Sequence, residues 1–67
     1  MNKNLLLSAM AKAGITSSEL SARIGVNQST LYRKIKGFSD FNRNELQIIK
    51  SVLSLTVDEF EKIFFEQ

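Results

Sequence analysis

The apolar residues of the chain recur at intervals of three and four positions in five separate stretches. In chain order, the residues that share one face in each stretch are Leu6, Met10 and Ala13; Leu20 and Ile24; Leu31 and Ile35; Leu46, Ile49 and Leu53; and Val57, Phe60 and Phe64. This spacing places each set on one side of an α-helix, whereas the alternation of period two that is typical of strands is absent. The pattern therefore predicts an all-α fold, a compact five-helix bundle, with helices at about residues 2–13, 17–24, 28–36, 43–53 and 57–66.

Four of the predicted helices begin with the same arrangement of an apolar residue, a capping residue and a polar first turn. The four segments are ITSSEL (15–20), VNQSTL (26–31), FNRNEL (41–46) and LTVDEF (55–60). The Thr or Asn in each can accept hydrogen bonds from the unpaired N–H groups of the first turn. In three of them a glutamate three residues later can complete a capping box, in the pairs Thr16 and Glu19, Asn42 and Glu45, and Thr56 and Glu59. The repetition indicates four helix N-termini.

The second and third predicted helices are joined by a very short turn. Only Gly25, Val26 and Asn27 separate residues 17–24 from residues 28–36, so the two helices have to cross steeply. Gly25 can adopt the positive φ that such a turn needs, and Val26 can pack inward as an apolar plug. This is the geometry of a helix-turn-helix, whose second helix can enter a major groove.

Positive charge is concentrated in the first two thirds of the chain. Residues 1–43 carry a net charge of +5 and residues 44–67 a net charge of −3, which together make the total of +2. The segment GVNQSTLYRKIKG (25–37) contains three basic residues and no carboxylate. Such an uneven distribution is typical of a protein that presents one face to a polyanion. Chance in a short chain is the alternative interpretation.

The composition disfavours most catalytic and metal chemistry. The 67 residues include no Cys and no His, which removes disulfides, thiolate and imidazole catalysis, and almost every zinc or iron site. The acidic residues lack the spacing of a calcium-binding loop. We therefore expect no enzyme activity, no cofactor, no metal and no small-molecule ligand. The length predicts a single domain over residues 1–67.

The N-terminal stretch MNKNLLLSAMAKAG is partly apolar, which raises the question of a targeting segment. Its apolar run is interrupted at Lys12 and is too short for a signal peptide or a membrane span. We therefore expect this stretch to form the first helix, and the protein to work in the cytoplasm and away from membranes. The start at Met1 and the end within a helix lead us to expect a complete protein rather than a piece of a longer one.

The segment TSSELSARIGVNQSTLYRKIKG (16–37) resembles the helix-turn-helix of the phage Cro and repressor family. NELQIIKSVLSLTVDEF (44–60) extends the resemblance into the fourth and fifth helices, so that about residues 14–64 are covered. The string YRKIKG and the ending IFF are similar to small Cro-like regulators of phages and prophages of Gram-positive bacteria. The resemblance implies a lambda-repressor-like fold and a transcriptional repressor that binds double-stranded DNA sequence-specifically.

The resemblance also implies which residues of the third helix read bases. Family members use the first residues of this helix and those one turn later, which here are Gln28, Ser29, Tyr32 and Arg33. The side chains suit the task, because Gln can pair with the adenine edge, Arg with guanine and Ser with either. Tyr32 has two interpretations: it packs beside Leu31 as part of the core, or it touches DNA.

Phosphate contacts are expected at two helix N-termini and at lysines of the third helix, because first-turn N–H groups and cations attract phosphate. The candidates are Ser17, Ser18, Lys34, Lys36, Asn42, Arg43 and Asn44. Two of them depart from the family pattern, since many relatives have Gln where Ser17 stands and an apolar residue where Lys34 stands. We expect the Lys34 stem to lie along the core edge and its ammonium to reach phosphate. Lys3 and Arg23 are expected to be solvated.

The fifth helix carries more apolar residues than one core-facing stripe needs. Phe60 and Phe64 suffice for that stripe, while Ile63 and Phe65 widen the apolar arc. Leaving a phenylalanine exposed forgoes about 2 kcal/mol of burial, so we expect these four residues to form a homodimer contact. A two-fold dimer would place two recognition helices about 34 Å apart on a roughly palindromic operator. The alternative is that a small domain buries every aromatic residue it has.

A different class of function stays open beside DNA binding. A protein-interaction module, such as an antitoxin or adaptor, could keep the helix-turn-helix fold and use the fifth helix and the acidic half of the chain instead. The two hypotheses differ in one prediction. Changing Gln28 and Arg33 to alanine would leave the function of an interaction module intact.

Overall fold

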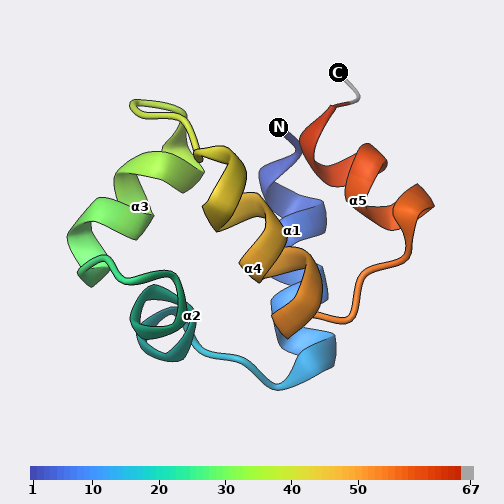
Figure 1. The fold of residues 1–67 in the computed structure, drawn as a ribbon, viewed down its shortest axis with the longest axis horizontal. Coiled ribbons are helices and arrows are strands. Elements are labelled where there is room, and N and C mark those ends of the chain that lie inside the picture. The colour runs from blue at the N-terminus through green and yellow to red at the C-terminus, as the bar shows by residue number, and fades with distance from the viewer. Residues whose placement is uncertain (66–67) are drawn as a thin grey trace.

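A computed structural model of the chain, which describes residues 1–65, contains five α-helices joined by loops (Figure 1). The helices are α1 (Lys3–Ala13), α2 (Ser17–Ile24), α3 (Gln28–Lys36), α4 (Arg43–Val52) and α5 (Val57–Phe64). These bounds confirm the all-α prediction, and the first four helices agree with their predicted bounds within one residue. α5 ends at Phe64, and residue 66, where its predicted range ended, lies outside the described residues.

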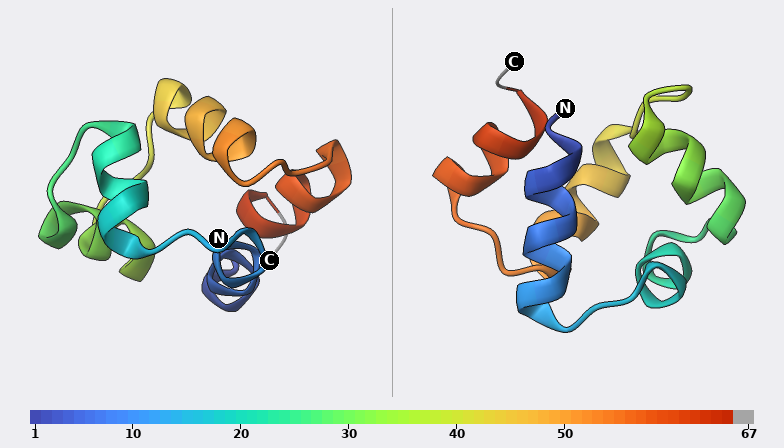
Figure 2. Two further views of the ribbon diagram at one scale, coloured as in Figure 1. Left: turned by 90° about the horizontal axis from the view of Figure 1, so that it is seen from below. Right: turned by 180° about the vertical axis from the view of Figure 1, so that it is seen from behind.

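The helices are arranged in two groups on either side of α4. α2 and α3 form one side of the molecule, and α1 and α5 form the other (Figure 1 and Figure 2). α2 packs against both α3 and α4, so it attaches the helix-turn-helix to the rest of the fold. α1 packs against α5, and the Asn2 N–H donates a hydrogen bond of 2.6 Å to the Ile63 carbonyl. The N-terminus is thereby held beside the last helix.

Each helix begins at a side-chain cap. The caps are Asn2, Thr16, Asn27, Asn42 and Thr56, and the side-chain oxygen of each accepts a hydrogen bond from the N–H three residues later. All three predicted capping boxes are present. A cap of this kind stabilises a helix by about 0.5–2 kcal/mol. The local sequence therefore accounts for where the helices begin.

The turn between α2 and α3 has the predicted geometry. Gly25 adopts the left-handed conformation with a φ of 79°, in which a side chain would be strained. The Val26 N–H donates a hydrogen bond of 3.0 Å to the Ser21 carbonyl, and the half-buried Val26 packs against the core. These features end α2 and direct the chain into α3 at a steep angle.

The core is built from the apolar stripes of all five helices. Its most deeply buried members are Leu6, Leu20, Leu31 and Ile49, and the other buried apolar residues are Met10, Ile24, Ile35, Leu53, Leu55 and Ile63. Two predicted core positions are wrong, because Val57 and Ala13 are exposed. Both are terminal residues of their helices, where the apolar stripe runs past the neighbouring helix. The buried side of α5 is centred on Ile63, which lies beside the N-terminus.

Candidate nucleic-acid interface

α3 divides into a buried apolar side and an exposed polar side. Leu31 and Ile35 are buried in the core. The other side carries five exposed residues, which are Gln28, Ser29, Tyr32, Arg33 and Lys36. Because neighbouring members of this set are one, three or four positions apart, they form one continuous strip along the helix. This α3 strip contains all four predicted base-reading residues.

The first turn of α3 determines how the Ser29 hydroxyl can be used. Asn27 Oδ1 accepts hydrogen bonds from the Thr30 N–H at 2.7 Å and from the Ser29 hydroxyl at 2.9 Å. The donor of Ser29 is therefore used within the cap, and the remaining lone pairs of its oxygen are acceptors. Ser29 is thus arranged to accept a hydrogen bond, such as one from the amino group of adenine or cytosine.

Tyr32 lies on the exposed strip, so the interpretation that it packs in the core is wrong, and its contact with DNA stays a prediction. The residue is 58% exposed, and the Lys36 ammonium lies 5.4 Å from the centre of its ring. A second such pair follows, in which the Arg33 guanidinium carbon lies 5.8 Å from the centre of the exposed Phe38 ring. Cation–π contacts at exposed sites contribute about 0.5–1 kcal/mol, enough to bias where these cations point. Phe38 was not predicted, although an aromatic residue directly after Gly37 was visible in the sequence.

A hollow beside α3 brings residues of three helices together. Its apolar lining residues are Leu7, Leu31 and Ile35. Its other lining residues are Lys3 from α1, Ser17 from α2, and Gln28, Ser29, Tyr32 and Lys36 from α3. Predicted base-reading and phosphate-binding residues therefore share one surface. Lys3, which was expected to be solvated, stands beside them.

The N-termini of α2 and α4 present further polar groups. Ser17 and Ser18 are exposed in the first turn of α2, and Arg43 and Asn44 are exposed in the first turn of α4. The side-chain oxygen of Asn42 accepts a backbone N–H of the first turn of α4 over 2.8 Å. This oxygen serves the helix cap, which leaves the side-chain NH₂ group of Asn42 as a hydrogen-bond donor.

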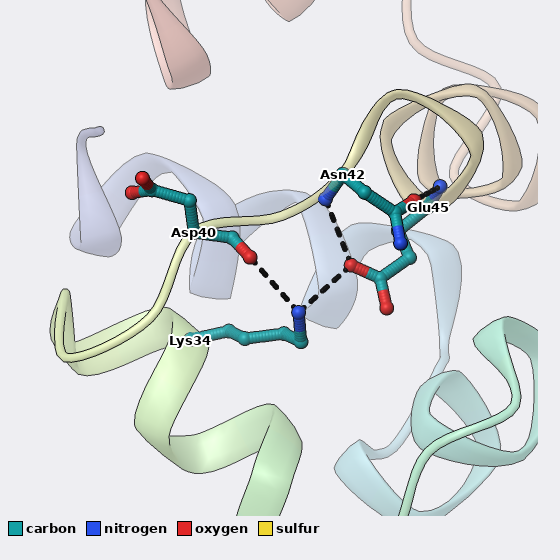
Figure 3. Close-up of polar contacts among 4 residues, drawn as sticks. All are labelled: Lys34, Asp40, Asn42 and Glu45. Carbon is teal, nitrogen blue, oxygen red and sulfur yellow. Dashed lines mark hydrogen bonds and ion pairs between the residues drawn. The ribbon is translucent and has the colours of Figure 1, made fainter.

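Lys34 is placed differently from the prediction (Figure 3). Its ammonium donates hydrogen bonds of 2.9 Å to the Asp40 carbonyl and of 2.9 Å to Glu45 Oε1. Only 11% of the Lys34 side chain and 7% of the Glu45 side chain are exposed. The prediction that the ammonium reaches phosphate is therefore wrong, although the residue is half-buried at the core edge as expected. The physical reason is the Glu45 carboxylate, which its capping role turns inward and which pairs with the nearest cation.

The sequence of the chain matches the model of one known protein family. Residues 6–66 match the family of Cro/C1-type HTH DNA-binding domains. The chain belongs to the Cro/C1-type helix-turn-helix family. It is accordingly a DNA-binding regulator domain, and α2 and α3 form its helix-turn-helix. Comparison with curated proteins and with solved structures finds no match.

The capping-box glutamates of this Cro/C1-type domain are stabilised in their ionised form. Burial raises the pKa of Glu45, but hydrogen bonds from the Asn42 N–H and the Lys34 ammonium outweigh it, so the pKa lies below its ordinary value. Hydrogen bonds from the backbone N–H and the hydroxyl of the capping threonines hold the pKa of Glu19 and of Glu59 below the ordinary value as well. Folding therefore favours the charged state of all three carboxylates.

Acid is expected to destabilise the Cro/C1-type domain through these carboxylates. A lowered folded-state pKa contributes stability that is complete above the unfolded-state pKa of about 4.3 and is lost as the pH falls through the folded-state value. The melting temperature, followed by circular dichroism, should stay level between about pH 7 and pH 5 and fall below about pH 4. Glu45→Gln keeps the capping acceptor but does not titrate, so its melting temperature should fall less steeply. An equally steep fall in both proteins would contradict this explanation.

The predicted dimer residues on α5 divide into a buried and an exposed set. Ile63 is only 3% exposed, so its assignment to a dimer contact is wrong and it belongs to the core. Phe60 and Phe64 are half-buried, with their ring centres 5.1 Å apart. Phe65 is 65% exposed, and its ring centre lies 5.7 Å from that of Phe60. Among the predicted dimer residues, exposed apolar surface therefore remains on Phe65 and on the half-buried Phe60 and Phe64.

Residues 1–65 of the Cro/C1-type domain contain no group of three acidic side chains close enough together to hold a metal ion. None of the helices in this part of the chain is long and apolar enough to cross a membrane.

Proposed function

We propose that this Cro/C1-type domain is a sequence-specific repressor of transcription, of phage or prophage origin, that binds a roughly palindromic operator as a homodimer. α3 enters the major groove, where Gln28, Ser29, Tyr32 and Arg33 contact base edges. The main support for this proposal is the α3 strip. It places hydrogen-bond donors, acceptors and cations on the exposed side of a helix whose other side is buried in the core. Gln28 suits an adenine edge, Arg33 a guanine edge, and Ser29 an exocyclic amino group.

Phosphate contacts would come from both sides of the groove. We assign them to Ser17 and Ser18 at the start of α2, to Lys36, and to Asn42, Arg43 and Asn44 at the start of α4. Helix N-termini direct N–H groups and the positive end of the helix dipole at phosphate. Residues 25–37 contain no carboxylate, so no side chain of the recognition helix repels the DNA backbone.

The exposed Phe65 supports a dimer through α5. Burying this ring against a second copy, with the outer edges of Phe60 and Phe64, would recover about 2 kcal/mol per phenylalanine. A two-fold dimer would then present two copies of α3 about 34 Å apart, the spacing of successive major grooves on one side of the duplex. Residues 1–67 form one domain that works in the cytoplasm. The bound dimer represses transcription by covering promoter DNA.

Selection of bound sequences from random DNA, followed by affinity measurements against salt, tests this proposal. We expect a preferred site with two related half-sites and two chains per duplex. A dimer with about six to ten phosphate contacts should lose about 10³-fold to 10⁵-fold in affinity between 50 and 200 mM salt. Binding with neither sequence preference nor salt dependence would contradict the whole proposal. One chain per duplex on an unrepeated site would remove the dimer alone.

A further inference from the structure

A cluster made of the Lys34 ammonium, the Asp40 backbone carbonyl and the Glu45 carboxylate links the loop between α3 and α4 to both helices (Figure 3). The Lys34 ammonium reaches the Asp40 carbonyl in the loop and Glu45 Oε1 in the first turn of α4. The same carboxylate oxygen accepts the Asn42 N–H over 2.9 Å. Glu45 Oε1 therefore links Lys34, in the last turn of α3, to Asn42, the N-cap residue of α4.

Lys34 and Glu45 form a direct side-chain contact between α3 and α4. Among the described residues, both helices pack against α2 rather than extensively against each other. The loop residues 38–40 are exposed, so apolar burial does not hold them in place. Phe41 is half-buried, and its ring centre lies 5.8 Å from the Lys34 ammonium and 5.9 Å from the ring centre of Phe64. The cluster and Phe41 together set where α4 begins relative to the end of α3.

Stability alone does not account for a nearly buried ion pair. Removing both charges from water costs about as much as their attraction returns, and apolar residues of the same volume are often equally stable at such a site. Charged hydrogen bonds add direction, because each one holds a particular atom in a particular place. The pair therefore contributes more to the geometry of the α3–α4 connection than to the free energy of unfolding.

We propose that Lys34 and Glu45 are positioning residues for DNA binding. They hold the N-terminus of α4, with Arg43 and Asn44, at the distance from the α3 strip at which both surfaces meet the same stretch of duplex. Lys34 directly follows Arg33, so anchoring Lys34 also sets the rotation of the turn from which Arg33 projects. This inference rests on the proposed function, and it adds the residues that align the two DNA-contacting surfaces without touching DNA themselves.

The test compares the wild-type chain with the double variant Lys34→Met, Glu45→Gln, called the clamp variant. Methionine matches most of the length of the lysine stem, and glutamine keeps an acceptor for the Asn42 N–H. One charge of each sign is removed, so the net charge stays at +2. The matched control is Asp58→Asn, Lys62→Gln, which removes an exposed ion pair of 3.3 Å on α5 and also preserves the net charge.

The clamp variant should keep its fold, but the N-terminus of α4 should no longer be held in a fixed position relative to the α3 strip. We expect its melting temperature to stay close to that of the wild type and of the control. Its affinity for the selected DNA should fall about tenfold, with a salt slope smaller by about 1, because phosphate contacts at the α4 N-terminus are lost. Amide hydrogen exchange should become faster at Gly37 and Phe38, whose N–H groups bond the last turn of α3.

Two different failures can be told apart in this experiment. A clamp variant with wild-type affinity, salt slope and exchange rates would overturn the positioning role and leave the proposed function standing. If the wild type itself bound DNA with neither sequence preference nor salt dependence, the proposed function would fail, and the positioning role with it. A loss of affinity as large in the α5 control as in the clamp variant would also overturn the inference, since it would trace the loss to charge removal in general.

Discussion

Replacing Gln28 and Arg33 together by alanine is expected to abolish sequence-selective DNA binding without unfolding the protein. Each side chain can form a paired contact with a base that is worth about 1–3 kcal/mol of discrimination. Losing both should therefore weaken binding to the selected site by about 30-fold to 10⁴-fold. Both residues are exposed, and exposed substitutions usually change the free energy of unfolding by less than about 0.5 kcal/mol. Fluorescence anisotropy titrations of the selected and a scrambled duplex measure the loss.

Arg23→Ala is the matched control for this prediction. Arg23 is an exposed cation in the last turn of α2 and lies outside the α3 strip in the sequence, so its removal changes the net charge as Arg33→Ala does. Its affinity for the selected site should stay close to that of the wild type. If the Gln28 and Arg33 double variant kept both its selectivity and its effect in cells, the α3 strip would not be the reading surface. A protein-interaction module that works through α5 would then be the better explanation.

Leu20→Ala is expected to have the largest effect on the fold. Leu20 is completely buried in α2, the helix that packs against both α3 and α4. Truncating a buried leucine costs about 2.7–5 kcal/mol, because the surrounding residues close the cavity only in part. A chain of 67 residues has a total free energy of unfolding of about 3–10 kcal/mol. The variant should therefore lose from about a quarter to all of its free energy of unfolding, as urea titrations followed by far-UV circular dichroism would measure.

Leu5→Ala makes the same chemical change at an exposed position. Leu5 lies on the outer side of α1 and keeps much of its surface in water, so its truncation removes little buried apolar area. The free energy of unfolding should change by less than about 0.5 kcal/mol. Equal losses in the two variants would contradict the placement of Leu20 at the centre of the core.

Much of the fold and the outline of the candidate interface were predictable because they depend on groups close together in the chain. Each capping residue bonds an N–H only three residues away, so the helix starts could be located from short segments. Helical periodicity also separated the two sides of α3, with Leu31 and Ile35 facing the core and the polar strip facing outward. The family match over residues 6–66 agrees with what these local patterns indicated.

The sequence by itself therefore determined the helices, the turn at Gly25 and the polar side of α3. Only the tertiary structure decided that Tyr32 is exposed, that Ile63 is buried and that Lys34 pairs with Glu45, eleven residues away. Periodicity tells which side of a helix a residue occupies, but not how far the neighbouring helices cover that side. A buried carboxylate selects its cation by distance in space, and that distance exists only once α3 and α4 have both docked on α2.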